Sequence, residues 1–300
     1  MQHKICICFQ KNVSLHGNPK SLFNMKATEI IEYMETLQNE KQRKVLMGFF
    51  KTGAGQYGEG DEFLGLKVPQ TREVVKAVGT DLPLEEVPEL LMSRWHEVRL
   101  CGWLILVARF EKLAAKRLVN DPDAVGKRDE IVRLYLKYAE RANNWDLVDL
   151  SAPKILGHWL LLPTALGGNG IGLNDDYKIT VFDGLAASPC LWKQRMSVVS
   201  SWKTTQQGNP FWCLRYAEWH LHHRHDLMHK AVGWMLREMG KRISMDLLRD
   251  FLKKHAHEMP RTMLRYAIEQ MSEVERLIWM NAAAFSDFTA FSDFPPRPKR

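Results

Sequence analysis

The feature that most constrains this chain is a series of amphipathic segments with helical spacing, separated by Gly, Pro and Asn, with almost no strand signal. Each segment places apolar residues every three to four positions, which is the period of one helix face. These segments predict an all-α fold. The expected helices cover 27–51, 70–79, 84–94, 96–118, 121–142, 144–162, 176–188, 191–203, 211–222, 225–240, 244–255, 260–271 and 273–283.

The helical segments also repeat weakly. RLCGWLILVARF (99–110) resembles KAVGWMLREMG (230–240), because each has a cation, two residues and then Gly-Trp. Three cations, Arg195, Lys230 and Arg265, open apolar helices at intervals of 35 residues. Helical repeats of about 34 to 47 residues are typical of stacked helix pairs. The sequence therefore predicts a curved superhelical stack of HEAT-like antiparallel helix pairs, whose concave side suits a long partner.

One large domain accounts for most of the 300 residues. We expect a poorly ordered N-terminal extension at 1–25, the helical-repeat domain at 26–283 and a flexible C-terminal tail at 284–300. The tail region repeats AFSDF and ends in prolines and cations. A Gly-rich connector at 53–69 and an apparent insertion at 163–176 interrupt the helical pattern.

Composition excludes several classes of protein. No run of about 18 uncharged apolar residues exists, so a membrane span is not expected. The N-terminus lacks the apolar core of a signal peptide. The odd, scattered cysteines fit a reducing cytoplasm rather than a disulfide framework, and the Cys6/Cys8 pair has no second pair to complete a zinc site. A net charge of +7 favours an anionic partner.

The segment NNWDLVDLSAPKILG (143–157) places two carboxylates and an indole at a helix start. Trp145 and Asp149 are four residues apart, so they share one helix face, whereas Asp146 points elsewhere and fits a first-turn charge. Taken alone, Trp145 fits a core residue and Asp149 a cap or a solvated charge. The alternative is a site in which the carboxylate faces a developing positive charge. Core or packing roles are expected for Trp103, Trp159, Trp219 and Trp279.

Five separated motifs, in order, resemble a known family. They are FFKTGAGQYGEGDEFLGLKVPQTREV, NNWDLVDLSAPKILG, LWKQRMSVVSSW, HKAVGWMLREMGKR and MPRTMLRYAIEQM. Together they are similar to the AlkD-like DNA alkylation repair proteins, which are HEAT-like-repeat DNA glycosylases. The resemblance covers about residues 27 to 280 and leaves out the insertion at 163–176.

The resemblance implies excision of positively charged alkylated purines, chiefly 3-alkyl and 7-alkyl forms, from duplex DNA. The family does not need to flip the damaged base into a protein pocket. Its active site has a tryptophan four residues before an aspartate, an arginine on a later helix and a second tryptophan on the following helix. Those positions correspond here to Trp145, Asp149, Arg195 and Trp234, and Tyr57 is the nearest candidate for a tyrosine of the family site. The resemblance thus implies that Asp149 stabilises an oxocarbenium-like sugar, while Arg195 holds a backbone phosphate.

The expected activity is that of a monofunctional glycosylase without a metal or cofactor, acting as a monomer on duplex DNA. No catalytic lysine is evident beside the motif, so strand cleavage is not expected. The alternative is a non-catalytic helical-repeat scaffold that binds DNA or protein. Release of methylated base would distinguish the two.

Two further segments bear on DNA binding. Between Arg224 and Lys254 there are eight Lys or Arg residues against four Asp or Glu, which fits either phosphate contacts or a solvated helix face. The segment HLHHRHDLMH (220–229) lacks a recognised metal-ligand pattern. Partial protonation of its histidines near DNA is the expected contribution.

Overall fold

The structure is a computed structural model that describes residues 26–282. Within that range it is all-helical, and its only β-structure is two isolated bridges, Glu62 with Trp95 and Thr164 with Gly172. The predicted fold class is confirmed. The N-terminal extension, the tail and the Cys6/Cys8 pair lie outside the described residues. Over the same range, no helix combines the length and the apolar character needed to cross a bilayer.

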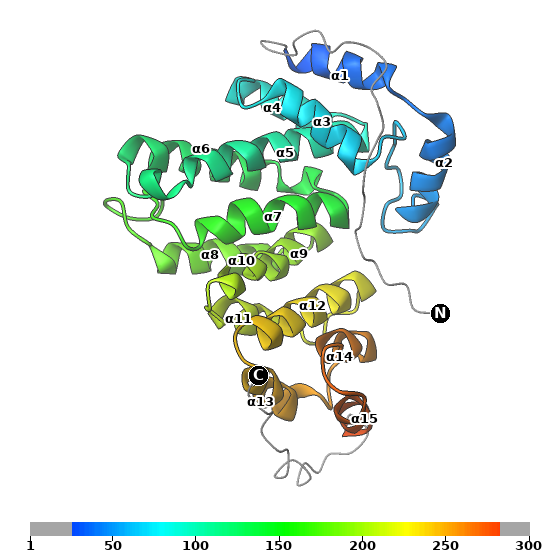
Figure 1. Ribbon diagram of the computed structural model, residues 1–300, viewed down its shortest axis with the longest axis vertical. Coiled ribbons are helices and arrows are strands. Elements are labelled where there is room, and N and C mark those ends of the chain that lie inside the picture. Colours follow the sequence, from blue (N-terminus) through cyan, green and yellow to red (C-terminus); the bar gives the residue numbers. More distant parts are fainter. Residues whose placement is uncertain (1–25, 283–300) are drawn as a thin grey trace.

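The helices run in chain order from one end of an elongated stack to the other (Figure 1). The first half contains α1 (Ala27–Thr36), α2 (Glu40–Phe49), α3 (Val68–Val78), α4 (Val87–Met92), α5 (His96–Leu113), α6 (Pro122–Lys137) and α7 (Trp145–Trp159). The second half contains α8 (Asp175–Ala186), α9 (Leu191–Val199), α10 (Ser201–Gln206), α11 (Phe211–Trp219), α12 (Asp226–Arg242), α13 (Met245–His255), α14 (Arg261–Ala267) and α15 (Glu273–Ala282). Short 3₁₀ turns lie at Leu84–Glu86, Lys116–Leu118 and Ala139–Arg141.

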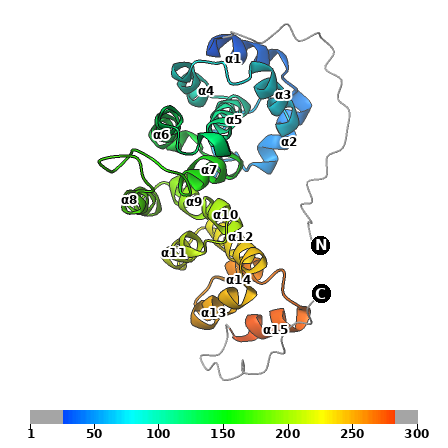
Figure 2. The same cartoon turned by 60° about the vertical axis from the view of Figure 1, so that its left-hand side comes forward.

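The stack has two layers. In the first layer, α3, α5, α7, α9, α12 and α14 contact one another in succession, with α10 continuing α9. The second layer consists of α4, α6, α8, α11 and α13, each packed on a first-layer helix. Figure 2 shows the stack bowed, with the first layer on the inner side of the bow and the second layer on the outer side. This arrangement is that of an α-helical repeat protein.

The repeated Gly-Trp pairs mark places where two helices cross closely. A Cβ at Gly102 of α5 would lie 2.9 Å from a Leu91 methyl of α4. A Cβ at Gly233 of α12 would lie 2.4 Å from the Met263 carbonyl oxygen of α14. Gly233 therefore needs to be glycine because the backbone of α14 leaves no room for a side chain, whereas at Gly102 a larger residue would displace the Leu91 side chain.

Several helix ends follow local capping rules. Asn39 accepts a hydrogen bond from the amide of Gln42 at the start of α2, and Asp121 does the same for Ala124 at the start of α6. The cap at Asn39 also explains a wrong prediction. The segment 27–51 is two helices, because Asn39 is extended and its amide donates to the Leu64 carbonyl of the connector.

Two further predictions need correction. The expected helix 191–203 is divided at Ser200 into α9 and α10. Core or packing roles were expected for four tryptophans: Trp103, Trp159 and Trp279 are fully buried, whereas Trp219 is 46 % exposed, so a core role is wrong for it. The segment 163–174 is held by Asp129, which accepts hydrogen bonds from Thr164 and Ala165. It projects beside α8, on the outer side of the bow (Figure 2).

Candidate active site

The centre of the site is an ion pair between two first-layer helices. Asp149, one turn into α7, accepts hydrogen bonds from both Nε (2.9 Å) and Nη2 (2.8 Å) of Arg195 on α9. The third nitrogen of this guanidinium, Nη1, donates to the Leu227 carbonyl of α12 at 2.5 Å. The Arg195 side chain is 6 % exposed and that of Asp149 is 16 % exposed. The carboxylate is therefore largely buried but keeps some exposure, while its arginine partner is more deeply buried.

Whether Asp149 is ionised depends on its pKa, which burial and its charged neighbours move in opposite directions. Burial raises the pKa of this carboxyl, while Arg195 opposes that rise through its charge and its hydrogen bonds. The nearby Asp146 carboxylate raises the pKa further. Arg195 is thus the group that favours the ionised form of Asp149.

Arg195 was predicted to hold a backbone phosphate. In the structure its nitrogens are engaged with Asp149 and with the carbonyl of Leu227. This bidentate geometry fixes the plane and position of the carboxylate, as arginine forks do. The phosphate contact itself stays a prediction.

Aromatic side chains border the ion pair. Trp145, the first residue of α7, is half-buried and stacks on Phe50, with 5.4 Å between ring centroids. The exposed ring of Phe49 meets the same indole edge-on at 5.9 Å. Sequence reasoning did not single out these two phenylalanines, although they stand side by side at the end of α2. The first tryptophan of the motif thus belongs to an aromatic cluster that reaches solvent.

Tyr57 lies on the connector between α2 and α3, yet it reaches the same place. Its ring contacts Trp192 of α9 edge-on at 6.2 Å. Burial raises the pKa of its hydroxyl, while a hydrogen bond with Trp145 lowers it, and the charges of Arg195 and Lys230 also act on it. The structure therefore brings Tyr57 to Trp145 and Arg195, as the resemblance implies.

Trp234 lies on α12 and is half-buried. It follows Leu227 by seven residues and Lys230 by four, so these three share one face of the helix. Leu227 contacts Arg195, and Lys230 is close enough to Tyr57 for their charges to interact. This places Trp234 on the face of α12 that turns towards the rest of the site.

Lys230 is a cation that sequence reasoning did not assign to the site. Its ammonium group lies 2.7 Å from the Asp226 carboxylate, and this hydrogen bond raises the pKa of the lysine. A lysine with a raised pKa is protonated near neutral pH and is therefore a poor nucleophile. It remains a cation beside the aromatic cluster.

Two residues next to each other on α5 were also missed. His96 and Glu97 are both buried, and both form hydrogen bonds with the connector between α2 and α3. Glu97 accepts three backbone hydrogen bonds, from Leu64, Gly65 and Leu66. The sequence offers one indication of this role. His96 and Glu97 follow Trp95 at the start of an apolar helix, and ionisable side chains that are buried there need hydrogen-bonding partners elsewhere in the chain.

The histidine-rich segment packs beside the site. His223 contacts Gln194 at 2.8 Å and His220 contacts Ser197 at 3.1 Å. Burial lowers the pKa of His220 to about 4, and it also lowers the pKa values of His223 and His225. These shifts favour neutral imidazoles in the protein alone, and the expected partial protonation near DNA stays a prediction. No group of three or more potential ligands is arranged to hold a metal ion among residues 26–282.

The basic segment 224–254 is less cationic than its composition suggests. Five of its eight cations form ion pairs: Lys230 with Asp226, Arg237 with Glu269, Arg242 with Glu238, Arg249 with Glu275 and Lys253 with Asp250. Much of this charge is thus neutralised within the protein.

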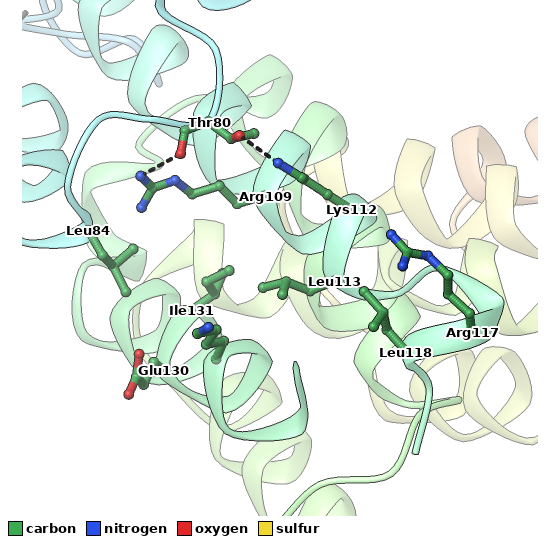
Figure 3. A pocket seen from close by; sticks show the side chains of 10 residues that line it. Thr80, Leu84, Arg109, Lys112, Leu113, Arg117, Leu118, Glu130 and Ile131 are labelled. Atoms are coloured by element: carbon green, nitrogen blue, oxygen red, sulfur yellow. Dashed lines mark hydrogen bonds between the residues drawn. The ribbon is translucent and has the colours of Figure 1, made fainter. Parts of the chain in front are cut away.

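A hollow of about 430 Å³ lies at the opposite end of α5, between Arg109, Lys112, Leu113 and the residues of α6 (Figure 3). It shares no residue with the aromatic and ionic cluster. Thirteen residues of helix, roughly 20 Å, separate Arg109 from His96.

The fold and the site together define a class of protein. It is an α-helical repeat protein in which a partly exposed carboxylate, an arginine and aromatic rings gather at the first layer. The family model described as DNA alkylation repair enzyme matches residues 30–271, so the chain belongs to that family. A solved structure similar to this chain is a predicted DNA alkylation repair enzyme from Enterococcus faecalis. The two share 14 % identity with a TM-score of 0.57, over 79 % of this chain and 97 % of the other. No curated protein matches the chain.

This membership supports a role in DNA alkylation repair and an enzymatic activity. The resemblance seen in the sequence is confirmed. At 14 % identity, the solved structure supports the fold alone.

Proposed function

We propose that this protein is a monofunctional DNA glycosylase that removes cationic alkylated purines, 3-alkyl and 7-alkyl forms, from duplex DNA. The observation that carries this proposal is the Asp149 carboxylate, held by Arg195 in a bidentate ion pair beside the surface indole of Trp145. Family membership supports the alkylation-repair part of the proposal.

The chemistry suits a fixed carboxylate. A purine alkylated at N3 or N7 carries a positive charge and is already a good leaving group, so a general acid is not required. When its bond to C1′ breaks, the electron pair leaves with the base and positive charge develops on the sugar. A preorganised carboxylate stabilises that charge and aligns the water that adds to C1′. Asp149 suits this role because Arg195 holds both of its oxygens in place and its side chain keeps 16 % exposure.

The aromatic rings act on the same cation. Indole faces attract positive charge with about 0.5–2 kcal/mol per contact. Trp145 and Trp234 would pack against the nucleotide from α7 and α12, with Tyr57 between them on the connector. The cluster lies at the protein surface, and this suits a base that is not drawn into a pocket.

Lys230 bears on two further points, the contact with the DNA backbone and the products of the reaction. Lys230 is a protonated cation beside the cluster, and although it is paired with Asp226 its side chain is 40 % exposed, so it suits a backbone phosphate next to the lesion. An ammonium cannot attack C1′, so no Schiff base forms and the products are a free base and an intact strand with an abasic site. We propose no metal or cofactor for this reaction.

The experiment is single-turnover release of 7-methylguanine from a duplex oligonucleotide by wild type and Asp149→Asn. The expected loss is roughly 10²–10³ in rate, which is typical when one preorganised electrostatic contact is removed. The matched control is Asp183→Asn, because Asp183 of α8 forms a similar bidentate pair with Arg215. The control should keep the wild-type rate. A wild-type protein that binds the duplex but releases no base would instead indicate the scaffold function.

A further inference from the structure

A buried charged cluster lies behind the site and has no part in the chemistry proposed above. His96 of α5 is 2 % exposed, and its Nδ1 lies 2.8 Å from Asp61 of the connector. Its Nε2 lies 2.9 Å from Asp146 in the first turn of α7. Arg99 donates to the other oxygen of Asp61. The imidazole therefore bridges two segments far apart in the sequence.

The geometry decides the charge of this imidazole. Ionised carboxylates only accept hydrogen bonds, so each ring nitrogen needs a proton to make its contact. A neutral imidazole carries one N–H and would turn a lone pair towards one of the carboxylates. Burial opposes the charged form, but Asp146 and Asp61 outweigh it and raise the pKa of His96 to about 9. His96 is thus an imidazolium at neutral pH.

The bridge continues as a column of rings up to the site. Phe63 stacks on His96 with 4.4 Å between centroids, and Phe50 stacks on Phe63 at 5.2 Å. Phe50 in turn stacks on Trp145 at 5.4 Å. The connector that contains Phe63 also contains Tyr57, so the contacts of His96 link the segment that carries Tyr57 to the helix that begins with Trp145.

We propose that His96 is a positioning residue of the active site: as an imidazolium joined to Asp61 and Asp146, it fixes the connector with Tyr57 against the start of α7 with Trp145. The inference rests on the proposed glycosylase function and deepens it. When His96 loses its proton, one carboxylate contact becomes repulsive, and the aromatic surface that receives the nucleotide loses its support.

Other charged groups face this cluster from each neighbouring element. Arg99 comes from α5, and Arg141 comes from the 3₁₀ turn before α7, where its charge acts on Arg99 and Asp61. Asp149 of α7 and the Tyr57 hydroxyl of the connector both respond to the charge of Asp146. Among these groups, His96 is the one whose pKa lies at about 9, and burial raises the pKa of the Tyr57 hydroxyl above its usual value of 10.0.

The test is single-turnover release of 7-methylguanine from a duplex oligonucleotide between pH 6 and 9.5, with release in the absence of enzyme subtracted. We expect the wild-type rate to fall above about pH 9. His96→Gln should be at least tenfold slower at pH 7 and should lack that fall. Asp146→Asn removes one of the two carboxylates that favour the imidazolium, so it should shift the fall to lower pH. Affinity for undamaged duplex should stay within about twofold in both variants.

A purely structural histidine would slow the reaction without changing its pH profile. An alkaline fall that persists in His96→Gln, or a wild-type rate from that variant at pH 7, overturns the proposal. If His96→Gln does not fold, the isosteric Asp146→Asn decides, and an unchanged midpoint overturns the proposal.

Failure of the glycosylase function would look different, because the wild-type protein would then release no base at any pH. The positioning role is measured in that case by amide hydrogen exchange of connector residues 58–66, corrected for intrinsic rates. We expect protection at pH 7 that drops at pH 9.5 and in Asp146→Asn at pH 8.5. Equal protection under all these conditions overturns the positioning role.

Discussion

The Arg195–Asp149 ion pair offers the sharpest prediction, because a second pair in the same chain has similar geometry in a different environment. Arg195→Ala removes a guanidinium that is 6 % exposed and donates to both oxygens of Asp149. Arg215→Ala removes a guanidinium that is 34 % exposed and donates to both oxygens of Asp183. The two substitutions delete the same atoms, so the difference between them reports burial together with the hydrogen bond from Arg195 to the Leu227 carbonyl.

The magnitudes follow from that difference. Breaking a buried ion pair costs about 3–5 kcal/mol, and we expect the lower end, about 3 kcal/mol, because Asp149 retains 16 % exposure. An exposed pair contributes about 0–1 kcal/mol. Asp183 also keeps a hydrogen bond from the Tyr216 hydroxyl, at 2.9 Å, so the loss of Arg215 falls within that range. For a chain of this size, about 3 kcal/mol corresponds to roughly 6 °C in Tm.

The same substitution changes the pH dependence in a definite direction. Arg195 opposes the rise that burial causes in the pKa of Asp149, so Arg195→Ala raises that pKa further. A raised carboxyl pKa means that the folded state binds the proton more tightly than the unfolded state. Stability then falls as the pH rises from the unfolded pKa through the folded one. The Arg195→Ala destabilisation should therefore be larger at pH 7 than at pH 4.

Urea denaturation at both pH values measures the stabilities, and base release measured from pH 4 to pH 7 follows ionisation of Asp149. We expect the acidic half of the rate profile to move to higher pH in Arg195→Ala and to stay in place in Arg215→Ala. Equal destabilisation by the two substitutions, or an unmoved acidic half, would refute the proposed dependence of the carboxylate on Arg195.

Two further predictions concern the connector and a buried lysine. A Cβ at Gly58 would lie 2.4 Å from the Phe50 carbonyl oxygen, so Gly58→Ala should displace the connector and lower both the rate of base release and the Tm. The control is Gly126→Ala on α6, where a Cβ would meet open space. It should stabilise the protein by about 0.5–1 kcal/mol in urea unfolding. Burial lowers the pKa of Lys178 to about 8, so the unfolded chain binds this proton more tightly and the contribution of Lys178 to stability should rise from about pH 8 towards pH 10.5; urea titrations should therefore show the stability of the wild type rising relative to that of Lys178→Met across that range.

Helical periodicity predicted most of the fold. Apolar spacing located the helices, and the repeated Gly-Trp pairs indicated stacking, which the close crossings at Gly102 and Gly233 explain. The break at Asn39 was missed because it depends on a hydrogen bond to Leu64, twenty-five residues away. Trp219 was misplaced because its position on one face of a short helix does not reveal that nothing covers that face.

The candidate site was likewise predictable where local sequence patterns define it and unpredictable where it depends on contacts between distant segments. Family motifs supplied Trp145, Asp149, Arg195 and Trp234, and the structure brings Tyr57 to the first of them. Spacing alone could not show that Arg195 is buried against Asp149, because the two residues are 46 positions apart. The role of His96 could not be predicted for the same reason. Its partners Asp61 and Asp146 are far from it in the sequence and contact it only when the connector folds back over α5.

The successive contacts of the first layer have a mechanical consequence. Each inner helix touches mainly the helix before and the helix after it, so small rotations at the crossings add up along the array. Arg195 and Trp234 lie on different helices of that array, and Tyr57 lies on the connector that leads into it. A slight tightening or opening of the whole bow would therefore change the spacing of all three side chains together, so the geometry of the site is linked to the curvature of the array.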